Sequence, residues 1–155
     1  MRVCGIDPGA NGAICVLDSH DPAHVALLDL GKVTPFDAYQ WLHKQQPNSI
    51  WIEDVHSLFG MSAKSNFGFG KNLGIVTAIA KIAINGQAVK TVVPKVWQKY
   101  VGVTVRGKAI KKQVAEIANT LYPTANLYGK RGGLLDGRAD ALMIAHYGLH
   151  NKEKV

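Results

Sequence analysis

The sequence predicts a single α/β domain over residues 1–155, with a mixed five-stranded sheet flanked by helices. Three observations carry this prediction. The chain has 155 residues, one domain's worth, and 47% of them are hydrophobic. Short apolar runs alternate with longer segments of helical periodicity. No linker, repeat or low-complexity tract interrupts the predicted order, which is β-β-β-α-β-α-β-α-α.

The first third of the chain predicts a hairpin, a third strand, a helix and a fourth strand. Residues 2–7 and 13–18 are apolar runs joined by PGANG, whose Pro, Gly and Asn residues are turn formers. A third strand is expected at 24–30. Residues 35–45 begin with Pro and have the apolar spacing of a helix, and a strand follows at 49–55.

The remainder predicts mostly helices. Residues 57–65 are small and polar, which is typical of a loop, whereas residues 66–85 carry apolar side chains on nearly every helical face. That helix is expected to be buried or paired with another chain. A glycine-rich loop is expected at 126–135. The other elements are a strand at 88–93 and helices at 95–101, 107–121 and 136–150.

The positive charge is concentrated in the middle of the chain. The whole sequence has 18 Lys and Arg against 11 Asp and Glu, a net charge of +7. Residues 55–135 hold twelve basic residues and a single acid, Glu116, whereas residues 1–54 hold three basic and seven acidic ones. Such a basic segment repels itself unless something anionic lies across it, so nucleic acid is the expected partner. A solvated Lys-rich face is the structural alternative.

Other function classes are not expected. The apolar runs are too short for a membrane span and the N-terminus lacks a signal peptide's apolar stretch, which predicts a cytoplasmic protein that does not bind membranes. Cys4 and Cys15 lie in strand-like runs and are expected to be buried thiols. GVTVRGK (102–108) has P-loop spacing, but Ala109 replaces the Ser or Thr that would hold Mg²⁺, so no nucleotide cofactor is expected. His146 is expected to be a packed or surface histidine.

Carboxylates end two predicted strands and begin the last helix. Asp7 follows the first strand, and Glu53 and Asp54 end the fourth. Alternation sends these last two side chains to opposite faces and leaves open which one joins Asp7. Asp136 and Asp140 lie one turn apart on one helical face. The structural alternatives are a turn cap for Asp7, an N-cap for Asp136 and a favourable helix-dipole charge for Asp140.

If the first and fourth strands are parallel neighbours, these carboxylates meet at one edge of the sheet. Four clustered carboxylates repel one another unless cations lie between them. Hard oxygen ligands together with an anionic partner indicate Mg²⁺ or Mn²⁺. Two such ions about 4 Å apart are the usual arrangement for phosphodiester hydrolysis, one activating the attacking water and the other stabilising the departing 3′ oxygen.

Three segments carry a resemblance to a known family. At these separations, GIDPGANGA (5–13), WIEDV (51–55) and DGRADALMIAH (136–146) resemble the RuvC-like Holliday-junction resolvases of the RNase H-like fold. The resemblance spans nearly the whole chain and is closer to small phage-encoded members than to the bacterial enzyme. It implies an RNase H-like nuclease domain in which these segments build the active site.

The resemblance also implies which carboxylates are catalytic metal ligands. The family's first Asp matches Asp7, its strand-four Glu matches Glu53 rather than Asp54, and its last Asp matches Asp140. The bacterial pattern has an Asp or His three residues before the last Asp, where this chain has Gly137. The nearest acid is Asp136, one residue earlier, and either spacing keeps the side chain on the same helical face as Asp140. Asp136 is therefore assigned as the fourth ligand.

DNA-contacting residues follow from the same resemblance. Where bacterial members have a Phe three residues after the Glu, this chain has His56, with Phe59 three residues further. The helix at 107–121 lies where the family has lysines that contact phosphates and assist catalysis, and Lys108 is expected to be catalytic. The expected DNA-binding residues are His56, Phe59, Lys64, Phe67, Lys71, Arg106, Lys108, Lys111 and Lys112.

The implied function is a divalent-metal-dependent endonuclease that resolves four-way junctions by paired nicks, leaving 5′-phosphate and 3′-OH ends. The alternatives are a flap, fork or three-way-junction nuclease of the same fold, and a junction-binding protein that does not cut. Two opposed strands must be nicked, so a two-fold homodimer is expected, with residues 66–85 as the seam; a core helix of a monomer is the structural alternative. The seam residues are expected to be Gly68, Gly70, Leu73, Gly74, Ile75, Val76, Ala78, Ile79 and Ile82.

Overall fold

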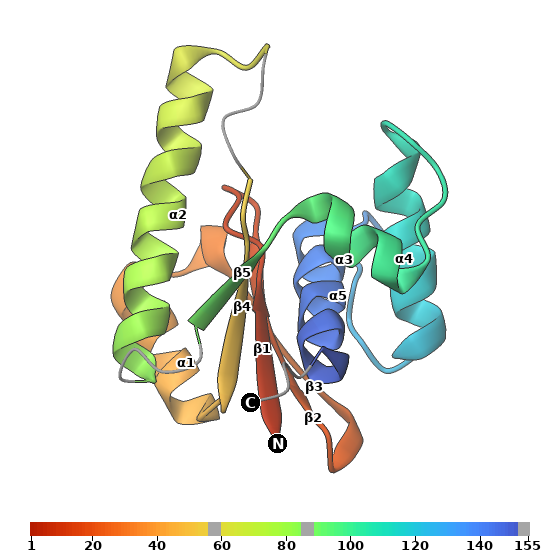
Figure 1. Cartoon of the computed structure of the whole chain (residues 1–155), viewed down its shortest axis with the longest axis horizontal. Helices are drawn as coiled ribbons and strands as arrows, with labels where there is room; N and C mark the ends of the chain where they lie inside the picture. The colour runs from red at the N-terminus through yellow and green to blue at the C-terminus, as the bar shows by residue number, and fades with distance from the viewer. Residues whose placement is uncertain (56–59, 85–88, 152–155) are drawn as a thin grey trace.

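The computed structural model describes residues 1–55, 60–84 and 89–151, which are built around one five-stranded sheet with the strand order β3-β2-β1-β4-β5 (Figure 1). The sheet is mixed, as predicted: β2 runs antiparallel to β1 and β3, whereas β4 runs parallel to β1 and β5. The strands are β1 (Arg2–Ile6), β2 (Ala13–Asp18), β3 (Asp21–Asp29), β4 (Ser49–Glu53) and β5 (Val89–Val92).

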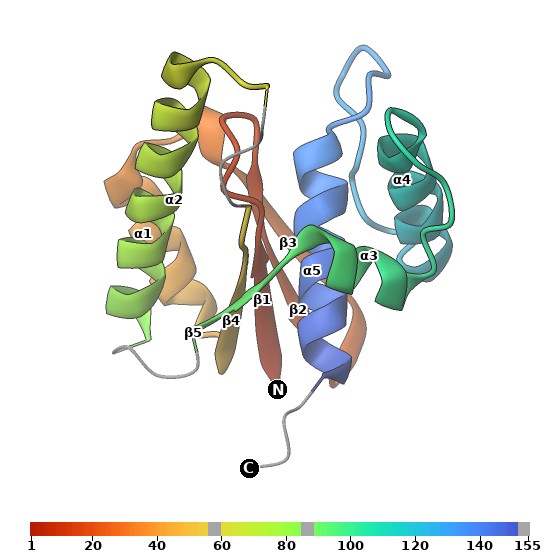
Figure 2. The same ribbon diagram turned by 45° about the horizontal axis from the view of Figure 1, so that its top comes forward.

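Helices cover both faces of the sheet. Figure 2 shows α1 and α2 on one side of the strands and α3, α4 and α5 on the other. Three helices follow β5, and the short α3 that begins at Pro94 is the helix expected at 95–101, which the predicted order of elements did not count. The helices are α1 (Pro35–Gln45), α2 (Ala63–Ala83), α3 (Pro94–Val101), α4 (Ala109–Leu121) and α5 (Asp136–His150), with a short 3₁₀ helix η1 (Leu30–Lys32).

Local capping chemistry sets the helix starts. Thr34, the N-cap residue of α1, and Asp37 form a reciprocal capping box. The helix begins at Pro35, where the sequence predicts. Helix α2 begins at Ala63, three residues before its predicted start, because the Ser62 hydroxyl accepts the Ser65 N–H at 3.1 Å. The predicted loop therefore ends earlier than its composition indicates.

Two apolar layers lie on either side of the sheet. Alternate residues of β1 belong to different layers: Val3 packs with α3, α4 and α5, whereas Cys4 packs with α1 and α2. Cys15 belongs to the same layer as Val3. Both thiols are free and fully buried, as expected from the sequence.

Helix α5 lies unusually close to the sheet, and glycines make this possible. A Cβ on Gly5 would overlap the backbone of Ala141 and Ala145, so β1 and α5 are in main-chain contact there. Near the other end of α5, a Cβ on Gly148 would overlap the Trp51 indole. The position of α5 relative to β1 and β4 is therefore set by backbone contact rather than by long side chains.

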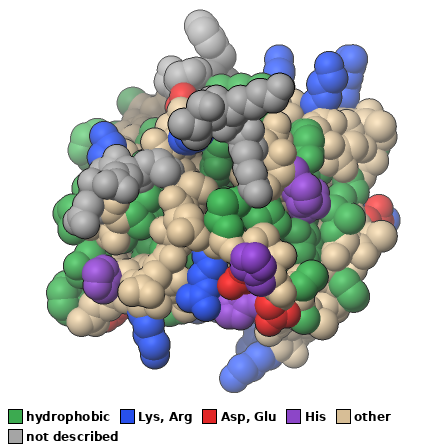
Figure 3. Space-filling view, turned by 60° about the horizontal axis from the view of Figure 1, so that its bottom comes forward, with side chains coloured by type: hydrophobic (Ala, Val, Ile, Leu, Met, Phe, Trp, Pro, Cys, Tyr) green, Lys and Arg blue, Asp and Glu red, His purple; other side chains and the backbone are tan. Residues whose placement is uncertain are grey.

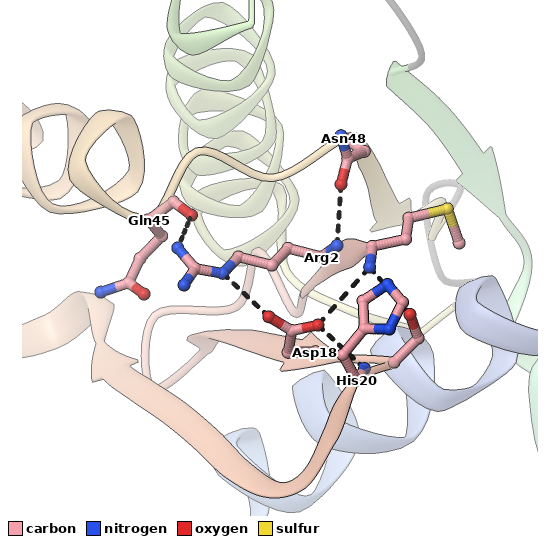
Figure 4. Close-up of polar contacts among 7 residues, drawn as sticks. Arg2, Asp18, His20, Gln45 and Asn48 are labelled. Atoms are coloured by element: carbon pink, nitrogen blue, oxygen red, sulfur yellow. Dashed lines mark hydrogen bonds and ion pairs between the residues drawn. The ribbon is translucent and has the colours of Figure 1, made fainter.

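Polar contacts hold the opposite end of the sheet together (Figure 4). The Arg2 guanidinium pairs with Asp18 at 3.2 Å and donates to the Gln45 carbonyl at 2.9 Å. The Arg2 backbone N–H donates to Asn48 Oδ1 at 2.8 Å. These bonds link the start of β1 to the end of β2 and to the segment after α1. In Figure 3, which faces this end, basic, acidic, histidine and apolar side chains are interspersed.

No helix in residues 1–55, 60–84 or 89–151 combines the length and the apolar character needed to cross a membrane.

The contact at Gly5 leads to a stability prediction. Gly5→Ala should lower the free energy of unfolding by about 2–3 kcal/mol, because the added methyl group must displace α5 from β1. The matched control is Gly133→Ala, where an added Cβ meets no atom within 4 Å and the change should stay within about 0.5 kcal/mol. Urea denaturation followed by circular dichroism measures both. Equal stabilities of the two variants would show that α5 can shift at no cost.

Candidate active site

Strand alternation and register bring Asp7 and Glu53 to the same edge and the same face. Gly5 of β1 pairs with Trp51 of β4 in parallel register, so the residues two positions on, Asp7 and Glu53, are neighbours. Trp51 packs in the layer that contains α5, and Glu53 shares its face. Asp54 follows on the opposite side. Register therefore settles the choice that alternation alone left open, in favour of Glu53.

Helix α5 supplies the other two carboxylates. Asp140 lies one turn after Asp136, next to Ala141, whose backbone contacts β1 at Gly5. Burial, followed by the charges of Asp7, Glu53 and Asp136, raises the pKa of Asp140 to about 8. Four carboxylates that the sequence separates by up to 133 positions thus interact at the carboxyl ends of β1 and β4.

Glu53 and Asp7 are held by hydrogen bonds in spite of this repulsion. Among the described residues Glu53 is the only buried charged side chain, and burial, followed by the charge of Asp7, raises its pKa to about 7. The buried Trp97 indole donates its N–H to Glu53 Oε1 at 2.9 Å. Burial also raises the pKa of Asp7, while the Gly9 backbone N–H, which donates to Asp7 Oδ1 at 2.9 Å, opposes the rise. Both carboxylates are thus oriented by donors.

Sequence reasoning missed Trp97. It is fully buried on α3 and joins Glu53 to the layer beneath α5. The available signal was a tryptophan in a short helix that is otherwise rich in polar residues, which indicates an anchored residue but does not indicate a carboxylate partner. The pairing depends on where α3 lies relative to β4, and only the tertiary structure shows that.

One lysine from α4 reaches the cluster. The Lys111 ammonium forms an ion pair with Asp136, and this hydrogen bond raises the pKa of Lys111. Lys112, the next residue, pairs instead with Glu116 at 3.9 Å on the exposed side of α4. Lys108, the expected catalytic lysine, is the exposed N-cap residue of α4. The structure therefore places Lys111 rather than Lys108 against the carboxylates.

The start of α5 explains why this chain has Gly137 where the bacterial pattern has an Asp or His. A Cβ at this position would overlap the Asn11 carbonyl and approach Gly12 Cα to 2.9 Å, so the turn after Asp7 leaves room only for glycine. An acid three residues before Asp140 is sterically excluded, and Asp136 is one residue earlier. Leu135, not Asp136, occupies the N-cap position of α5, so Asp136 is a first-turn residue rather than a cap.

Arg138 fixes this helix start and was also missed. Its guanidinium donates to Asp29 at 2.6 and 2.9 Å and to the Asn126 carbonyl at 2.8 Å. The paired guanidinium lowers the pKa of Asp29 to about 2, with Lys32 adding to the effect. Asp29 ends β3, so a bidentate ion pair ties the helix that carries Asp136 and Asp140 to the far edge of the sheet.

The donor set fits a hard divalent cation in chemistry and charge. All four side chains offer carboxylate oxygens, and the raised pKa values of Asp7, Glu53 and Asp140 show that positive charge among them is favourable. Within the described part of the chain, no three His, Cys, Asp or Glu side chains are arranged so that they could hold a metal ion as they stand. Ligation of an ion by these side chains would therefore require a change in their positions.

The expected DNA-binding residues fall on two flanks of the carboxylates. Lys64, Phe67 and Lys71 are exposed on the first half of α2, whereas Arg106 and Lys108 are exposed before α4. Figure 2 shows the start of α2 and the loop before α4 on opposite sides of the β1–β2 turn, at the same end of the molecule. His56 and Phe59 lie outside the described residues.

Comparison with known proteins identifies the fold. No model of a known protein family and no curated protein matches the sequence. Among solved structures, Thermus thermophilus RuvC is similar with a TM-score of 0.58 and 19% identity, over 96% of each chain. The same protein in complex with a Holliday junction gives a TM-score of 0.56 and 18% identity, over 94% of this chain and 90% of that one.

A viral protein shares the architecture. The Fowlpox virus resolvase, in complex with Holliday junction DNA, gives a TM-score of 0.52 and 15% identity, over 96% of this chain and 99% of that one. Together these likenesses confirm the RNase H-like, mixed-sheet fold expected from the motifs. At the level of fold, the resemblance to RuvC-like proteins is confirmed.

The raised pKa of Asp140 leads to a pH-dependent prediction in the absence of divalent ions. The folded state keeps a proton on Asp140 up to about pH 8, whereas the unfolded state loses it near pH 3.8. Stability is therefore lost as the pH rises from 3.8 to about 8, and the full cost is present above that pH. Asp140→Asn should therefore raise the Tm at pH 9 by about 3–5 °C and change it little at pH 4. Differential scanning calorimetry in EDTA measures the difference.

Asp29→Asn is the control of opposite sign. Because Arg138 lowers the pKa of Asp29 to about 2, its stabilising contribution is present above pH 3.8 and is lost as the pH falls through about 2. This variant should lower the Tm at neutral and alkaline pH. A lower Tm for Asp140→Asn at pH 9 would show that Asp140 is not destabilised by its neighbours.

Proposed function

We propose that this protein is a divalent-metal-dependent endonuclease that resolves four-way DNA junctions by paired nicks, leaving 5′-phosphate and 3′-OH ends. The observation that carries the proposal is the convergence of Asp7, Glu53, Asp136 and Asp140 between two basic flanks. Buried acids between phosphate-binding surfaces weaken DNA binding unless they hold cations. The fold, shared with solved structures of resolvases bound to junctions, supports the same substrate.

The residues of this chain have distinct roles in the proposed reaction. Asp7, Glu53, Asp140 and Asp136 would hold Mg²⁺ or Mn²⁺, which would supply an activated water and charge stabilisation at the departing oxygen. Trp97 keeps Glu53 oriented through its N–H donor. Lys111, which pairs with Asp136 among the carboxylates, would place a positive charge beside the scissile phosphate. Gly9 holds Asp7 in the turn after β1.

The substrate class is tested by direct comparison of DNA structures. End-labelled four-way junction, flap, fork, three-way junction and plain duplex are incubated in one buffer, with Mg²⁺ and with EDTA. The proposal expects symmetric cuts in the four-way junction, little cutting of duplex and none in EDTA. Faster cutting of flaps or forks would indicate a flap or fork nuclease of the same fold rather than a junction resolvase. Tight binding without cutting would indicate a binding protein.

Carboxylate variants should separate binding from cutting. Asp7→Asn, Glu53→Gln and Asp140→Asn should each lower cutting by at least about 100-fold while junction affinity stays equal or rises, since each removes a negative charge near phosphates. Asp136→Asn should be the mildest of the four. Cleavage assays and gel shifts on the same preparations measure both properties.

Asp54→Asn is the matched control for the carboxylate series. It removes a carboxylate adjacent in sequence to Glu53 but on the other face of the sheet, and it should keep cutting near the wild-type level. A Glu53→Gln variant that retained more than a few per cent of wild-type cutting would remove Glu53 from the proposed site.

We also propose a homodimer, with a corrected seam. Val76 and Ile79 are buried against the sheet within one chain, so Ile79 is not available to a partner. The outward stripe of α2 consists instead of small residues, one lysine and Ile82, which is 63% exposed. The residues of this stripe are Gly70, Gly74, Ala78, Lys81 and Ile82. Phe67 and Lys71 stay with the expected DNA-binding flank.

A charge on this stripe should separate the subunits without unfolding them. Ile82→Glu should give a folded monomer that binds junctions about 10-fold more weakly and nicks one strand at a time. Leu121→Glu, at a residue 46% exposed on α4, is the matched control and should remain dimeric. Analytical ultracentrifugation measures the mass, and a supercoiled plasmid that extrudes a cruciform shows whether the first product is linear or open-circular.

The dimer proposal has a clear contrary result. Wild-type protein that sediments as a monomer on junction DNA, and converts the plasmid only to open circle, would contradict it. The resolvase function would then give way to a nuclease that cuts one strand of a branched structure.

A further inference from the structure

The segment before α5, expected as a plain loop, contains a short hairpin. Tyr128 and Leu134 form an antiparallel bridge, and the Gly129 N–H donates to the Gly133 carbonyl at 2.8 Å. The Gly132 N–H closes the turn on the Gly129 carbonyl at 2.9 Å, and Gly132 has a φ of +78°, which favours glycine. We call residues 128–134 the basic hairpin, because Lys130 and Arg131 form its tip.

The base of the basic hairpin is anchored to the fold. Leu127 is fully buried, and its carbonyl accepts the Leu135 N–H at 2.9 Å. The Tyr128 hydroxyl accepts a hydrogen bond from the Asn119 side chain on α4 at 3.1 Å. Arg138 holds the Asn126 carbonyl and is itself clamped by Asp29. Three connections therefore fix the hairpin relative to α4 and α5.

The charges at the tip are not neutralised within the described part of the chain. Lys130 and Arg131 are exposed, and neither forms an ion pair or a side-chain hydrogen bond with a described residue. Several other basic residues differ in this respect, since Lys32, Lys111, Lys112 and Arg138 each pair with an acid. Two adjacent positive charges on an anchored turn are therefore available to an external anion.

The position of the hairpin points to the anion. Its second strand leads directly into Asp136, five residues after Arg131. In Figure 2 the light blue segment between α4 and α5 projects beyond the start of α5. The tip therefore lies at the end of the molecule where α5 begins with its carboxylates, on the flank of the sheet that α4 and α5 cover. Phosphates of a nucleic acid that reaches the carboxylates would pass along this flank.

We propose that the basic hairpin is a DNA contact, in which Lys130 and Arg131 bind backbone phosphates of the arm that leaves the cleavage site on the α4 side. This proposal rests on the proposed function for the presence of DNA at the carboxylates. It adds a contact that the motif comparison did not indicate. Phosphate contacts of this kind position the substrate and carry no base preference, so the effect of the hairpin is independent of sequence.

Salt-dependent binding tests the proposal without requiring cleavage. Affinities of wild type and the double variant Lys130→Ala/Arg131→Ala for a labelled four-way junction are measured by fluorescence anisotropy in EDTA, over a range of salt concentrations. Two lost phosphate contacts should reduce the slope of log K against log salt by about 1.8 and weaken binding roughly 10-fold near physiological salt. Both side chains are exposed, so the variant should fold as wild type.

A matched charge-removing variant serves as the control. Lys44→Glu also lowers the net charge by two, at an exposed lysine near the end of α1, which lies at the opposite end of the molecule (Figure 1). It changes the net charge equally but removes no contact near the carboxylates. A slope for the hairpin variant equal to that of this control would overturn the proposal, because only the overall charge would then matter.

Site-directed cleavage locates the tip on the DNA. Cys4 and Cys15 are fully buried, so Arg131→Cys provides a single accessible thiol for a tethered iron–EDTA reagent. Hydroxyl-radical cuts should fall on one arm for each subunit, which is two symmetry-related arms for a dimer, within a few nucleotides of the bonds that the protein hydrolyses in Mg²⁺. Cuts spread evenly over all arms, or absent, would overturn the proposal.

The outcomes separate this proposal from the proposed function. If wild type binds and cuts junctions but the hairpin variant keeps the control's slope, only the hairpin contact fails. If wild type binds junctions with the predicted hairpin effect but cuts none of the substrates, the hairpin contact stands and the nuclease activity fails. If wild type binds no DNA, both fail.

Discussion

The backbone contact between α5 and β1 is the constraint on which the candidate site depends. Gly5 allows the main chain of Ala141 and Ala145 to lie directly against the strand. Asp140 precedes Ala141, so the same contact sets the distance between Asp140 and the carboxylates at the ends of β1 and β4. Any larger residue at position 5 would widen the separation between helix and sheet. The glycine is therefore as much a part of the site as the acids are.

That contact forces acids together, and the rest of the fold offsets the resulting repulsion. Trp97 donates to Glu53, Gly9 donates to Asp7, and Lys111 pairs with Asp136. Helix α5 is kept in place by the Arg138–Asp29 ion pair at its start and by apolar packing along its length. Four carboxylates that repel one another lower the stability of the fold. Burial of apolar side chains in the two layers on opposite faces of the sheet must offset this loss.

The basic residues complete the picture of a negatively charged centre between positively charged flanks. One flank is the first half of α2, and the other side of the sheet carries the loop before α4 and the basic hairpin. The same chain segments that carry these charges connect elements of the core. Positive charge that would be unfavourable on a compact domain by itself becomes favourable when a polyanion lies across the centre.

Much of this could be predicted from the sequence, and the exceptions have a common physical cause. Strand and helix positions follow from local periodicity and capping, and the carboxylates were found because they end strands or begin a helix at motif positions. Sequence periodicity left the choice between Glu53 and Asp54 open, and it indicated neither Trp97 as a donor nor Ile79 as a core residue. Each of these depends on which face of one element lies against another.

The sequence by itself thus determined the type and order of most elements, the chemistry of the site and the sign of the charge around it, because these are properties of neighbouring residues along the chain. The tertiary structure decided the rest. It placed Lys111 rather than Lys108 against the acids, left glycine as the only residue that fits at position 137, and buried Ile79 while exposing Ile82. Those facts come from register and from the close approach of α5, which join residues far apart in sequence and leave no periodic signal.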